Sequence, residues 1–282
     1  MKTKTALLLI LFIITLLINN HAFAQVNLNE GLVDYYPFNG NANDESGNGN
    51  DGTVYGATLT EDRFGNPNGA YFFDGNNDYI DIEDVSDFEF VNQDLTFSAW
   101  VQIVDNANDY RYFISLGDPI SANRRSIGLN KARSDLSGYD GRIYIEVTTP
   151  FPVDDYTSMS NDNGDELPKY EWMLVTGVLD YSNLQIKLYI NGVIQDDINF
   201  LGDFDLSIVE QLKFHIGCWV SGTKYKTWHK GILDDIRIYN RALNEQEIQA
   251  LYTESQPNFT CGQPLTDIRD GQTYQTVPIG SQ

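Results

Sequence analysis

Short runs of β-branched and aromatic residues recur along most of this chain, while helical periodicity is nearly absent. Clusters of Gly, Asn and Asp separate the runs, as expected for strands joined by turns. The runs cover residues 70–73, 78–82, 95–103, 110–117, 125–130, 141–147, 171–180, 184–190, 212–220 and 231–240. Many short strands of this kind predict antiparallel sheets packed face to face, so we expect an all-β, two-sheet sandwich.

Two local signals predict where the chain turns and where a helix begins. Asn191-Gly192 can take positive φ at both central positions, which favours a tight hairpin between the segments on either side. Asn244 is a good N-cap, and Glu247 is placed to complete a capping box. Leu243 and Ile248 have the spacing of a hydrophobic staple. We therefore expect one short helix near the C-terminus, plugging one end of the sandwich.

The first 24 residues have the form of a secretory signal peptide. Lys2 and Lys4 precede an apolar run from Ala6 to Ile18, and the small-x-small sequence of residues 22–24 follows. We expect cleavage after Ala24 and a mature protein that is secreted or held at the cell surface. The apolar run is shorter than the roughly 20 residues that a spanning helix needs, so no membrane insertion is expected.

The charge of the chain narrows the choice of partners. The formal net charge is −22 at pH 7, and loss of Lys2 and Lys4 would make it −24. This charge repels the phosphates of nucleic acids and acidic membrane surfaces, so the sequence predicts no nucleic-acid partner.

The chain has two cysteines, Cys218 and Cys261, which are too few for a disulfide scaffold. Cys218 lies in an apolar run, where a buried free thiol is expected. Cys261 lies in a polar segment. Its partner can be Cys218 or a group outside the chain, and we favour the second.

Several segments between residues 31 and 252 together resemble the laminin-G-like, pentraxin-related branch of the concanavalin A-like jelly-roll family, found in secreted bacterial proteins. These segments are residues 31–57, 62–82, 95–101, 171–180, 184–193 and 231–252, in matching order and spacing. The resemblance implies a jelly-roll domain, which we place at residues 25–254.

The tail resembles a different family. Residues 266–282 are similar to the opening of the major paralogous domain of Fibrobacter and Bacteroidetes secreted proteins, and the segment TYQTV within them reads as a strand without a partner. We therefore expect a linker over residues 255–265 and then the truncated start of a downstream domain in the same polypeptide. An ordinary disordered tail is the alternative.

Residues 44–52 form an unbroken run of acidic, amide, hydroxyl and glycine residues. Counting from Asp44, the side-chain oxygens of Asn48 and Asn50 fall at odd positions, as in an EF-hand loop. Tyr55 stands where that loop requires a bidentate glutamate, and a strand follows instead of a helix. The run is therefore not an EF-hand, although it can still supply oxygen ligands to a cation.

A carboxylate in the last strand also points to a metal. Alternation puts Asp234 in phase with Ile232, Ile236 and Ile238, which should face the core. Burying it is costly unless it is paired, hydrogen-bonded or bound to a cation. The resemblance implies that the first and last strands are neighbours, and that some members hold a structural calcium ion there. The predicted calcium ligands are Asp44, Asp234, and Asn48 or Asn50. A metal-free loop whose amides Asp234 caps is an equal alternative.

Two stretches are locally basic in this acidic chain and can hold an anionic glycan or a matrix carboxylate. They contain Arg124, Arg125, Lys131 and Arg133, and Lys224, Lys226 and Lys230. The second stretch also offers aromatic rings on which sugars can stack. The predicted ligand-binding residues are Trp219, Tyr225, Trp228, Arg124 and Arg125. Packing of Trp219 or Trp228 under a sheet edge is the simpler alternative.

The usual signatures of catalysis are missing. Laminarinase-type enzymes on this scaffold carry Glu-x-Asp-x-x-Glu on one strand, but here Asp81 and Glu83 are followed by Ser86, which predicts an outward polar face. There is no Gly-x-Ser-x-Gly turn, and His215 and His229 alone give no zinc pattern. We predict no catalytic residues.

The sequence thus predicts a secreted, non-catalytic recognition module that binds carbohydrate or another extracellular matrix or surface component. Two other classes stay open. One is a structural spacer that presents a downstream domain, and the other is a glycoside hydrolase whose carboxylates come from separate strands.

Overall fold

The structure is a computed structural model. It describes residues 26–85, 92–104, 110–118, 125–131, 142–148, 156–159, 168–199, 213–221, 225–254, 264–267 and 272–275. The predicted signal peptide and Cys261 lie outside the described residues, so those predictions stay as they are.

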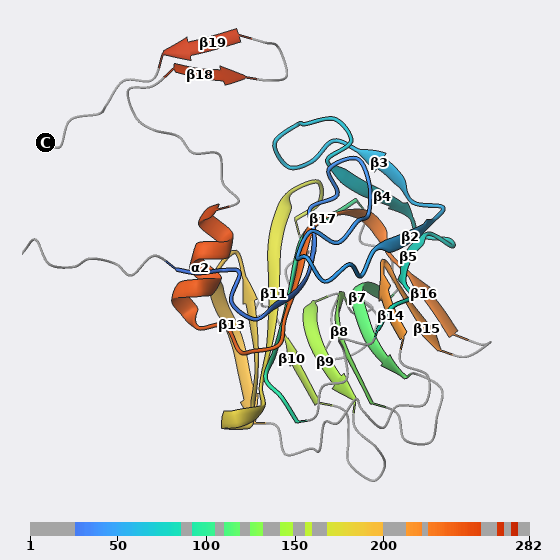
Figure 1. The fold of residues 1–282 in the computed structure, drawn as a ribbon, viewed down its shortest axis with the longest axis vertical. Helices are drawn as coiled ribbons and strands as arrows, with labels where there is room; N and C mark the ends of the chain where they lie inside the picture. Colours follow the sequence, from blue (N-terminus) through green and yellow to red (C-terminus); the bar gives the residue numbers. More distant parts are fainter. Residues whose placement is uncertain are drawn as a thin grey trace, which may run out of the picture.

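Two large antiparallel sheets make up the fold, which confirms the predicted all-β, two-sheet sandwich (Figure 1). The first sheet has the order β13 (Val193–Asn199), β12 (Gln185–Ile190), β11 (Trp172–Asp180), β6 (Leu95–Ile103), β17 (Lys230–Tyr239), β4 (Ala70–Asp74) and β3 (Thr58–Thr60), with β1 (Leu32–Tyr36) also paired to β17. The second has the order β10 (Tyr156–Met159), β9 (Ile143–Thr148), β8 (Arg125–Lys131), β7 (Arg111–Asp118), β14 (Lys213–Ile216), β5 (Tyr79–Ile82) and β2 (Gly52–Tyr55).

Two smaller strand pairs accompany the sheets. β15 (Cys218–Ser221) pairs with β16 (Tyr225–Trp228), and β18 (Pro264–Asp267) pairs with β19 (Gln272–Gln275). The expectation that the tail strand lacks a partner is therefore wrong, because β19 pairs with a strand that begins inside the expected linker. A 3-10 turn, η2 (Tyr181–Asn183), joins β11 to β12.

The main core lies between the two sheets, where alternate residues of each strand point inward. Phe97 and Val101 of β6 face it from the first sheet, and Ile127 and Leu129 of β8 from the second, all completely buried. Cys218 is buried, as predicted. The described residues contain no helix long and apolar enough to cross a membrane.

The predicted hairpin at Asn191-Gly192 is confirmed. Ile190 pairs with Val193, and the two turn residues have φ of 52° and 77°, which lets β12 return directly into β13.

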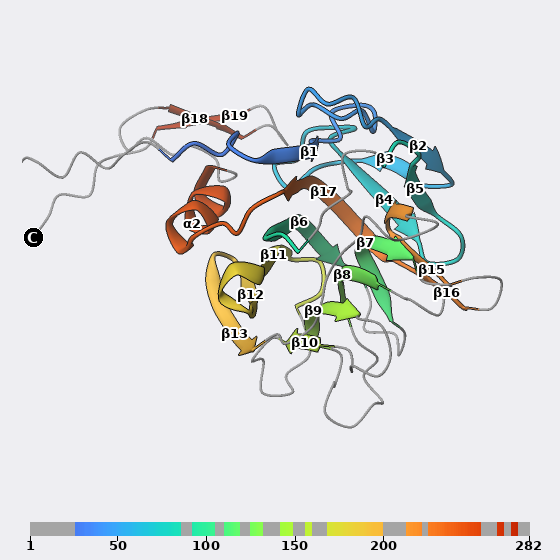
Figure 2. The ribbon, with the colours of Figure 1, turned by 60° about the horizontal axis from the view of Figure 1, so that its bottom comes forward.

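The helix α2 (Glu245–Glu254) starts as its sequence predicts but lies elsewhere. The Asn244 side chain accepts hydrogen bonds from the Gln246 and Glu247 amides, while the Glu247 carboxylate accepts one from the Asn244 amide, which completes the capping box. Its apolar side, with Ile248 and Leu251, packs on Trp100, Leu174, Val178 and Tyr189. These residues belong to β6, β11 and β12, so α2 covers the outer face of the first sheet rather than plugging an end (Figure 2).

A bulge in β17 changes the predicted direction of Asp234. β17 pairs with β6 along one edge, but the register shifts between Asp234 and Arg237, and Asp235 has φ of 44°. Leu233 and Ile236 therefore both face the main core. Asp234 pairs with Trp100, whose ring belongs to the outer cluster beneath α2. The prediction that Asp234 faces the core was wrong, because alternation fails where a strand carries an extra residue.

Candidate ligand-binding face

The outer face of the second sheet carries a row of polar and aromatic side chains. In β14, Phe214 and Ile216 point into the core, so Lys213 and His215 point outward. The pairing places His215 opposite Asp81 of β5 on one side and opposite Ser115 of β7 on the other. Ile80 and Ile82 are fully buried, which confirms that Asp81 lies on the outward polar face.

A hairpin folds back over this row. Gly217 ends β14 with φ of +82° and so divides the predicted strand 212–220, after which β15 and β16 run as a separate pair. The Gly217 amide donates to the Phe113 carbonyl at 2.9 Å, and the His229 amide donates to the Gly217 carbonyl at 2.7 Å. Ser115 Oγ donates to the Cys218 carbonyl at 2.8 Å. These bonds hold the hairpin against the outer face.

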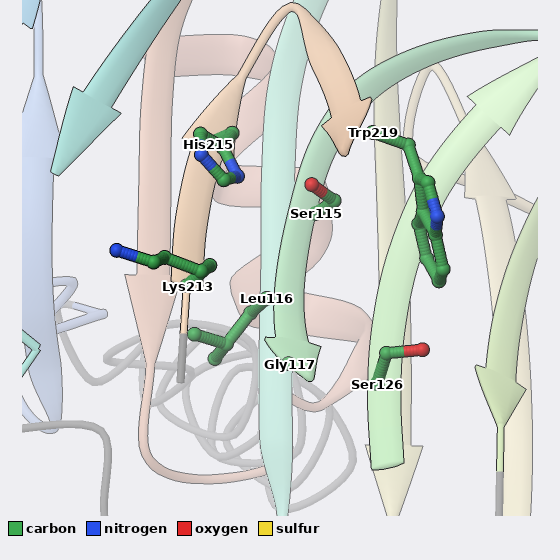
Figure 3. A pocket seen from close by; sticks show the side chains of 7 residues that line it. All are labelled: Ser115, Leu116, Gly117, Ser126, Lys213, His215 and Trp219. Atoms are coloured by element: carbon green, nitrogen blue, oxygen red, sulfur yellow. The ribbon is translucent and has the colours of Figure 1, made fainter. Parts of the chain in front are cut away.

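A hollow lies beneath the hairpin (Figure 3). It is shallow, with about 10 Å³ of space for water-sized molecules, and it opens to solvent. It is lined by Ser115, Leu116, Gly117, Ser126, Lys213, His215 and Trp219. The Trp219 ring forms one wall, beside Ser126 of β8, while His215 and Lys213 lie on the opposite side. Ser115 is 6% exposed and His215 7%, so the polar floor is sheltered but reachable.

The two predicted tryptophans both lie over this face. The half-buried Trp219 ring packs against Tyr112, with centroids 4.7 Å apart, and the Tyr112 hydroxyl donates to Glu146 Oε2 at 2.7 Å. The half-buried Trp228 ring tilts against Tyr79 at 5.8 Å. Packing and ligand contact are thus compatible here, because each ring has one side on the sheet and keeps part of its surface in solvent.

A second group of rings continues the face toward its edge. Tyr55 of β2 stacks on Tyr79, with centroids 4.6 Å apart and 9° between the planes. Tyr55 is 40% exposed. Tyr79 also contacts His215 edge-on at 6.0 Å, so the aromatic group adjoins the hollow.

Several predicted binding residues lie outside the described side chains. Arg124 is outside the described residues, and the backbones alone of Arg125 in β8 and Tyr225 in β16 are described. Their roles remain predictions. Lys131, counted in the first basic stretch, is 1% exposed and therefore does not form part of a surface patch.

His215 is the titratable group at the centre of the hollow. Burial lowers its pKa below the ordinary value, Asp81 opposes this shift and Lys213 adds to it. His215 Nε2 lies 3.6 Å from Asp81 Oδ1. The imidazole is therefore neutral at pH 7, which leaves Lys213 as the cation of the hollow.

The sequence carries a signal for Lys213 and His215. Alternation with Phe214 and Ile216 puts both side chains on the outward face. Ser126 could not be found in this way, because its place beside them depends on the pairing of β7 with β8.

The oxygen-rich loop is organised around Asp44. Asp44 Oδ1 accepts from the Tyr35 and Ser46 amides at 3.0 and 2.8 Å, and Oδ2 accepts from the Gly49 and Asn50 amides at 2.9 and 3.2 Å. The Ser46 hydroxyl also donates to Oδ2. Asn48 and Asn50 instead use their amide nitrogens as donors, to the Val33 carbonyl and to Asp34.

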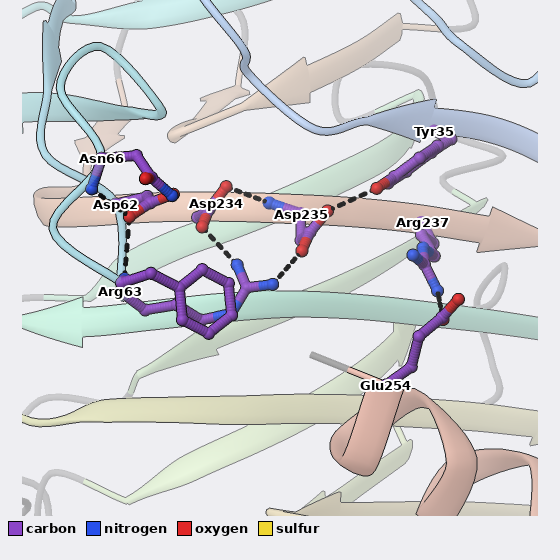
Figure 4. A network of polar contacts seen from close by, with 9 residues as sticks. Tyr35, Asp62, Arg63, Asn66, Asp234, Asp235, Arg237 and Glu254 are labelled. Atoms are coloured by element: carbon purple, nitrogen blue, oxygen red, sulfur yellow. Dashed lines mark hydrogen bonds and ion pairs between the residues drawn. The ribbon is translucent and has the colours of Figure 1, made fainter. Parts of the chain in front are cut away.

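Asp234 has different partners (Figure 4). The Arg63 guanidinium binds both Asp234 and Asp235, and it lies over the Trp100 ring with its centre 5.0 Å from the ring centroid. Asp234 also accepts from the Asp235 amide at 2.8 Å. Burial, the largest cause, and the neighbouring Asp235 raise the pKa of Asp234 to about 8, and Arg63 opposes them.

The predicted calcium ligands are therefore not brought together. β1 does pair with β17, as the resemblance implies, but no hydrogen bond or ion pair joins Asp234 to Asp44. The described residues contain no group of three or more His, Cys, Asp or Glu side chains that could hold a metal. In this structure Arg63 holds Asp234, while the amides of its own loop surround Asp44. Calcium binding by the loop alone stays a prediction.

Asp44→Asn should lower the free energy of unfolding by about 1–3 kcal/mol at pH 7, since an amide cannot accept on both sides from backbone donors. Burial raises the pKa of Asp44, but the bonds from Tyr35, Ser46 and Gly49 together outweigh it and lower the pKa. The stabilisation is therefore present above the unfolded-state pKa of about 4 and is lost as the pH falls through the lower folded value. Urea unfolding at pH 7 and pH 2.5, in chelator, measures it.

A loss of equal size at both pH values would contradict this account of Asp44. Repeating the wild-type measurement with millimolar calcium tests the metal, because an ion bound by the native loop would raise the melting temperature.

Comparison with known proteins identifies the family of this fold. The family described as the concanavalin A-like lectin/glucanases superfamily matches residues 74–249. No curated protein matches the chain. Domain 4 of AbnA, a GH43 extracellular arabinanase from Geobacillus stearothermophilus, solved in complex with arabinotriose, is 21% identical over 78% of this chain and 98% of that one, with a TM-score of 0.58.

Two toxin domains are also similar. The receptor-binding domain of botulinum neurotoxin D is 17% identical over 81% of this chain and 54% of its own, with a TM-score of 0.58. The binding domain of Paraclostridial Mosquitocidal Protein 1 is 18% identical over 81% and 53%, with a TM-score of 0.60. This chain thus spans about half of each toxin domain, and at these identities the likeness concerns the fold.

Proposed function

The chain belongs to the concanavalin A-like lectin/glucanases superfamily, and from this premise we propose that it is a secreted, non-catalytic module that binds carbohydrate on the outer face of its second sheet. The single observation that carries the proposal is the hollow walled by Trp219 with Ser115, Ser126, His215 and Lys213 around it. An aromatic wall above a few sheltered polar groups is the usual composition of a small-ligand site.

The arrangement suits a sugar in two respects. The Trp219 ring is held by Tyr112, so it offers a flat surface without losing rotamer freedom on binding. The hydroxyl of Ser126 and the amine of Lys213 can bond to sugar oxygens from the floor and the rim. The hollow has only about 10 Å³ of space, room for about one water molecule, so a sugar would lie across its mouth against Trp219 and not inside it.

The placement of carboxylates supports binding without catalysis. At the outer row, Glu83 follows Asp81 on the same face at the end of β5. β14, β7 and β8 lie between β5 and β9, which carries Glu146. Four strand spacings separate them by about 19 Å. Glycoside hydrolases need two carboxyl groups about 5–9.5 Å apart, so Glu146 cannot form such a pair with Asp81 or Glu83. Glu146 is in addition bonded to Tyr112.

Export and a glycan partner outside the cell are part of the same proposal. The N-terminal segment has the charge, apolar run and cleavage site of a secretory signal. Domain 4 of AbnA, which shares the fold, was solved with a trisaccharide. That complex supports the choice of glycans as the first ligands to test.

Trp219→Ala should abolish binding on a glycan array and weaken a soluble oligosaccharide hit by about thirtyfold or more, since truncating a central aromatic anchor commonly costs 2 kcal/mol or more. Calorimetry with the array hit measures the loss. The matched control is Tyr170→Ala, which removes an aromatic side chain that is 68% exposed at the start of β11 in the other sheet. The control should bind as the wild type does.

The proposal fails if the wild type binds no neutral or acidic oligosaccharide, or if Trp219→Ala binds unchanged. Melting temperatures of both variants show whether a loss of binding comes from unfolding instead.

A further inference from the structure

We propose that the β15–β16 hairpin is an acid-responsive flap, closed over the outer face of the second sheet at neutral pH and released when the imidazole of His215 takes up a proton. The movement of the hairpin does not depend on which ligand the protein binds. Its consequence for ligand binding rests on the proposed function, because the hairpin carries Trp219.

The hairpin is built as a separate element. Among the described strands, β15 and β16 pair only with each other. A two-stranded hairpin is marginally stable on its own, so its position depends on its contacts with the sheet. The Gly217 amide donates to the Phe113 carbonyl at 2.9 Å, and Ser115 Oγ donates to the Cys218 carbonyl at 2.8 Å. Gly217, with φ of +82°, lies where the chain leaves β14 for the hairpin and is the hinge of the flap.

His215 lies beneath the hairpin, where a charge is costly. Its side chain is 8% exposed, and the hollow between it and Trp219 has room for about one water molecule. Its ring contacts Tyr79 edge-on, and Tyr79 in turn packs against Trp228 of β16. A protonated imidazole therefore cannot be hydrated while the hairpin is closed, which disfavours the charged form.

The charged groups around His215 do not cancel this cost. Asp81 of β5 favours the protonated ring, but its Oδ1 lies 3.6 Å from Nε2, beyond hydrogen-bond distance, and its side chain is 22% exposed. Lys213 of β14 disfavours the protonated ring, and Glu83, which follows β5, stands opposite Lys213 in register. The neighbouring groups of β5, β7 and the hairpin that carry no charge at pH 7 or below are Tyr79, Ser115, Cys218 and Trp219.

The direction of the response follows from this burial. Burial lowers the pKa of His215 below its ordinary value, Asp81 opposes this shift and Lys213 adds to it. In the released form the ring is solvated, and its pKa returns to about 6.5. The closed form therefore has its full stability above about pH 6.5. It loses stability as the pH falls from there toward the lower pKa of the closed form, because the released form binds the proton more tightly.

Amide hydrogen exchange followed by NMR tests the movement. Release breaks the bond from the Gly217 amide to Phe113, so the protection factor of this amide should fall between pH 7.5 and pH 5, after correction for the intrinsic exchange rate. The matched control is the Tyr170 amide, which donates to the Ile103 carbonyl of the first sheet at 2.8 Å and should keep its protection. In His215→Gln the Gly217 amide should keep its protection as well.

Two further variants should change the response in opposite directions. Asp81→Asn removes the group that favours the protonated ring, so the Gly217 amide should lose more protection at pH 5 than in the wild type. Lys213→Gln removes a group that disfavours it, so the amide should lose less. Both variants keep His215, and they test its role as the sensor even if His215→Gln does not fold.

Three results overturn the flap and leave carbohydrate binding standing. The first is an unchanged protection factor of the Gly217 amide in the wild type, and the second is an equal fall in His215→Gln. The third is an equal fall at Tyr170, which shows general unfolding in acid. A response that disappears in His229→Gln and persists in His215→Gln assigns it to the other buried histidine and also overturns the inference.

The ligand gives a separate result. A glycan that contacts Trp219 binds the closed hairpin, so adding an oligosaccharide found on the array should raise the protection of the Gly217 amide at pH 5. A bound glycan that leaves this protection unchanged lies elsewhere, which contradicts the proposed function and not the flap. A blank array likewise overturns the proposed function alone, because the exchange measurement needs no ligand.

Discussion

Arg63→Ala should lower the free energy of unfolding by about 3–5 kcal/mol, the typical cost of removing one partner from a buried ion pair. The Arg63 side chain is 8% exposed and holds Asp234 and Asp235, whose side chains are 2% and 12% exposed. Without the guanidinium these two adjacent carboxylates lose the one cation that binds both, and only Asp235 still interacts with a second cation, Arg237. Urea unfolding measures the loss.

The pH dependence of that loss has a definite sign. Burial and Asp235 already raise the pKa of Asp234 to about 8, and removal of Arg63 raises it further. A carboxyl group whose pKa is raised in the folded state costs no stability at a pH where it is protonated in both states. It destabilises the folded state as the pH rises above its unfolded-state pKa of about 4. The difference between wild type and Arg63→Ala should therefore be smaller at pH 5 than at pH 9.

Two variants check the assignment of this effect to Asp234. Arg63→Ala combined with Asp234→Asn should recover part of the stability, because the buried charge is gone. Lys187→Ala breaks the pair with Asp180, in which the lysine is 23% exposed, and should cost under about 1 kcal/mol. If Arg63→Ala lost as little stability as Lys187→Ala, the ion pair of Arg63 with Asp234 and Asp235 would be solvated.

Gly217→Ala should lower the free energy of unfolding by about 2–6 kcal/mol. Its φ of +82° is strained for a residue with a Cβ, which costs about 1–3 kcal/mol. A Cβ at this position would also collide with the ring of Phe73, which is fully buried in the main core. Overpacking of this kind adds about 1–3 kcal/mol.

Gly47→Ala separates the two contributions. Gly47 also has a positive φ, of +101°, but nothing lies within 4 Å of a Cβ built there. It should therefore lose the strain contribution alone, and chemical denaturation should place Gly217→Ala clearly below it. Equal losses would mean that Phe73 moves aside at no cost. Binding by Gly217→Ala should also weaken, because the alanine displaces the hairpin that carries Trp219.

The strands and turns could be predicted because their signals are local. The strand predicted at residues 95–103 has the same bounds as β6. Asn191-Gly192 correctly predicted a hairpin, and Asn244 the start of α2. The face that α2 covers could not be predicted, since it depends on apolar residues of three strands that come together only in the folded sheet.

The site was harder to predict for a related reason. Alternation assumes one residue per pairing step, and the bulge after Asp234 breaks that assumption without any glycine or proline to mark it. Arg63 lies 171 positions from Asp234 along the chain, so the sequence offers no spacing that would link them. The sequence indicated Trp219 and Trp228 because they lie in a short stretch rich in aromatic and basic residues. The floor of the hollow could not be predicted, because its residues come together only through the pairing of β7 with β8 and β14.

The position of β17 has a consequence for how the protein comes to be made. This strand is one of the last of the domain to leave the ribosome, yet it occupies the middle of the first sheet, between β6 on one side and β4 and β1 on the other. Until it arrives, the edges of β1, β4 and β6 have no partner to close on. Such long-range closure is slow, so we expect the first sheet to be completed late in folding, when β17 joins strands from the first half of the domain.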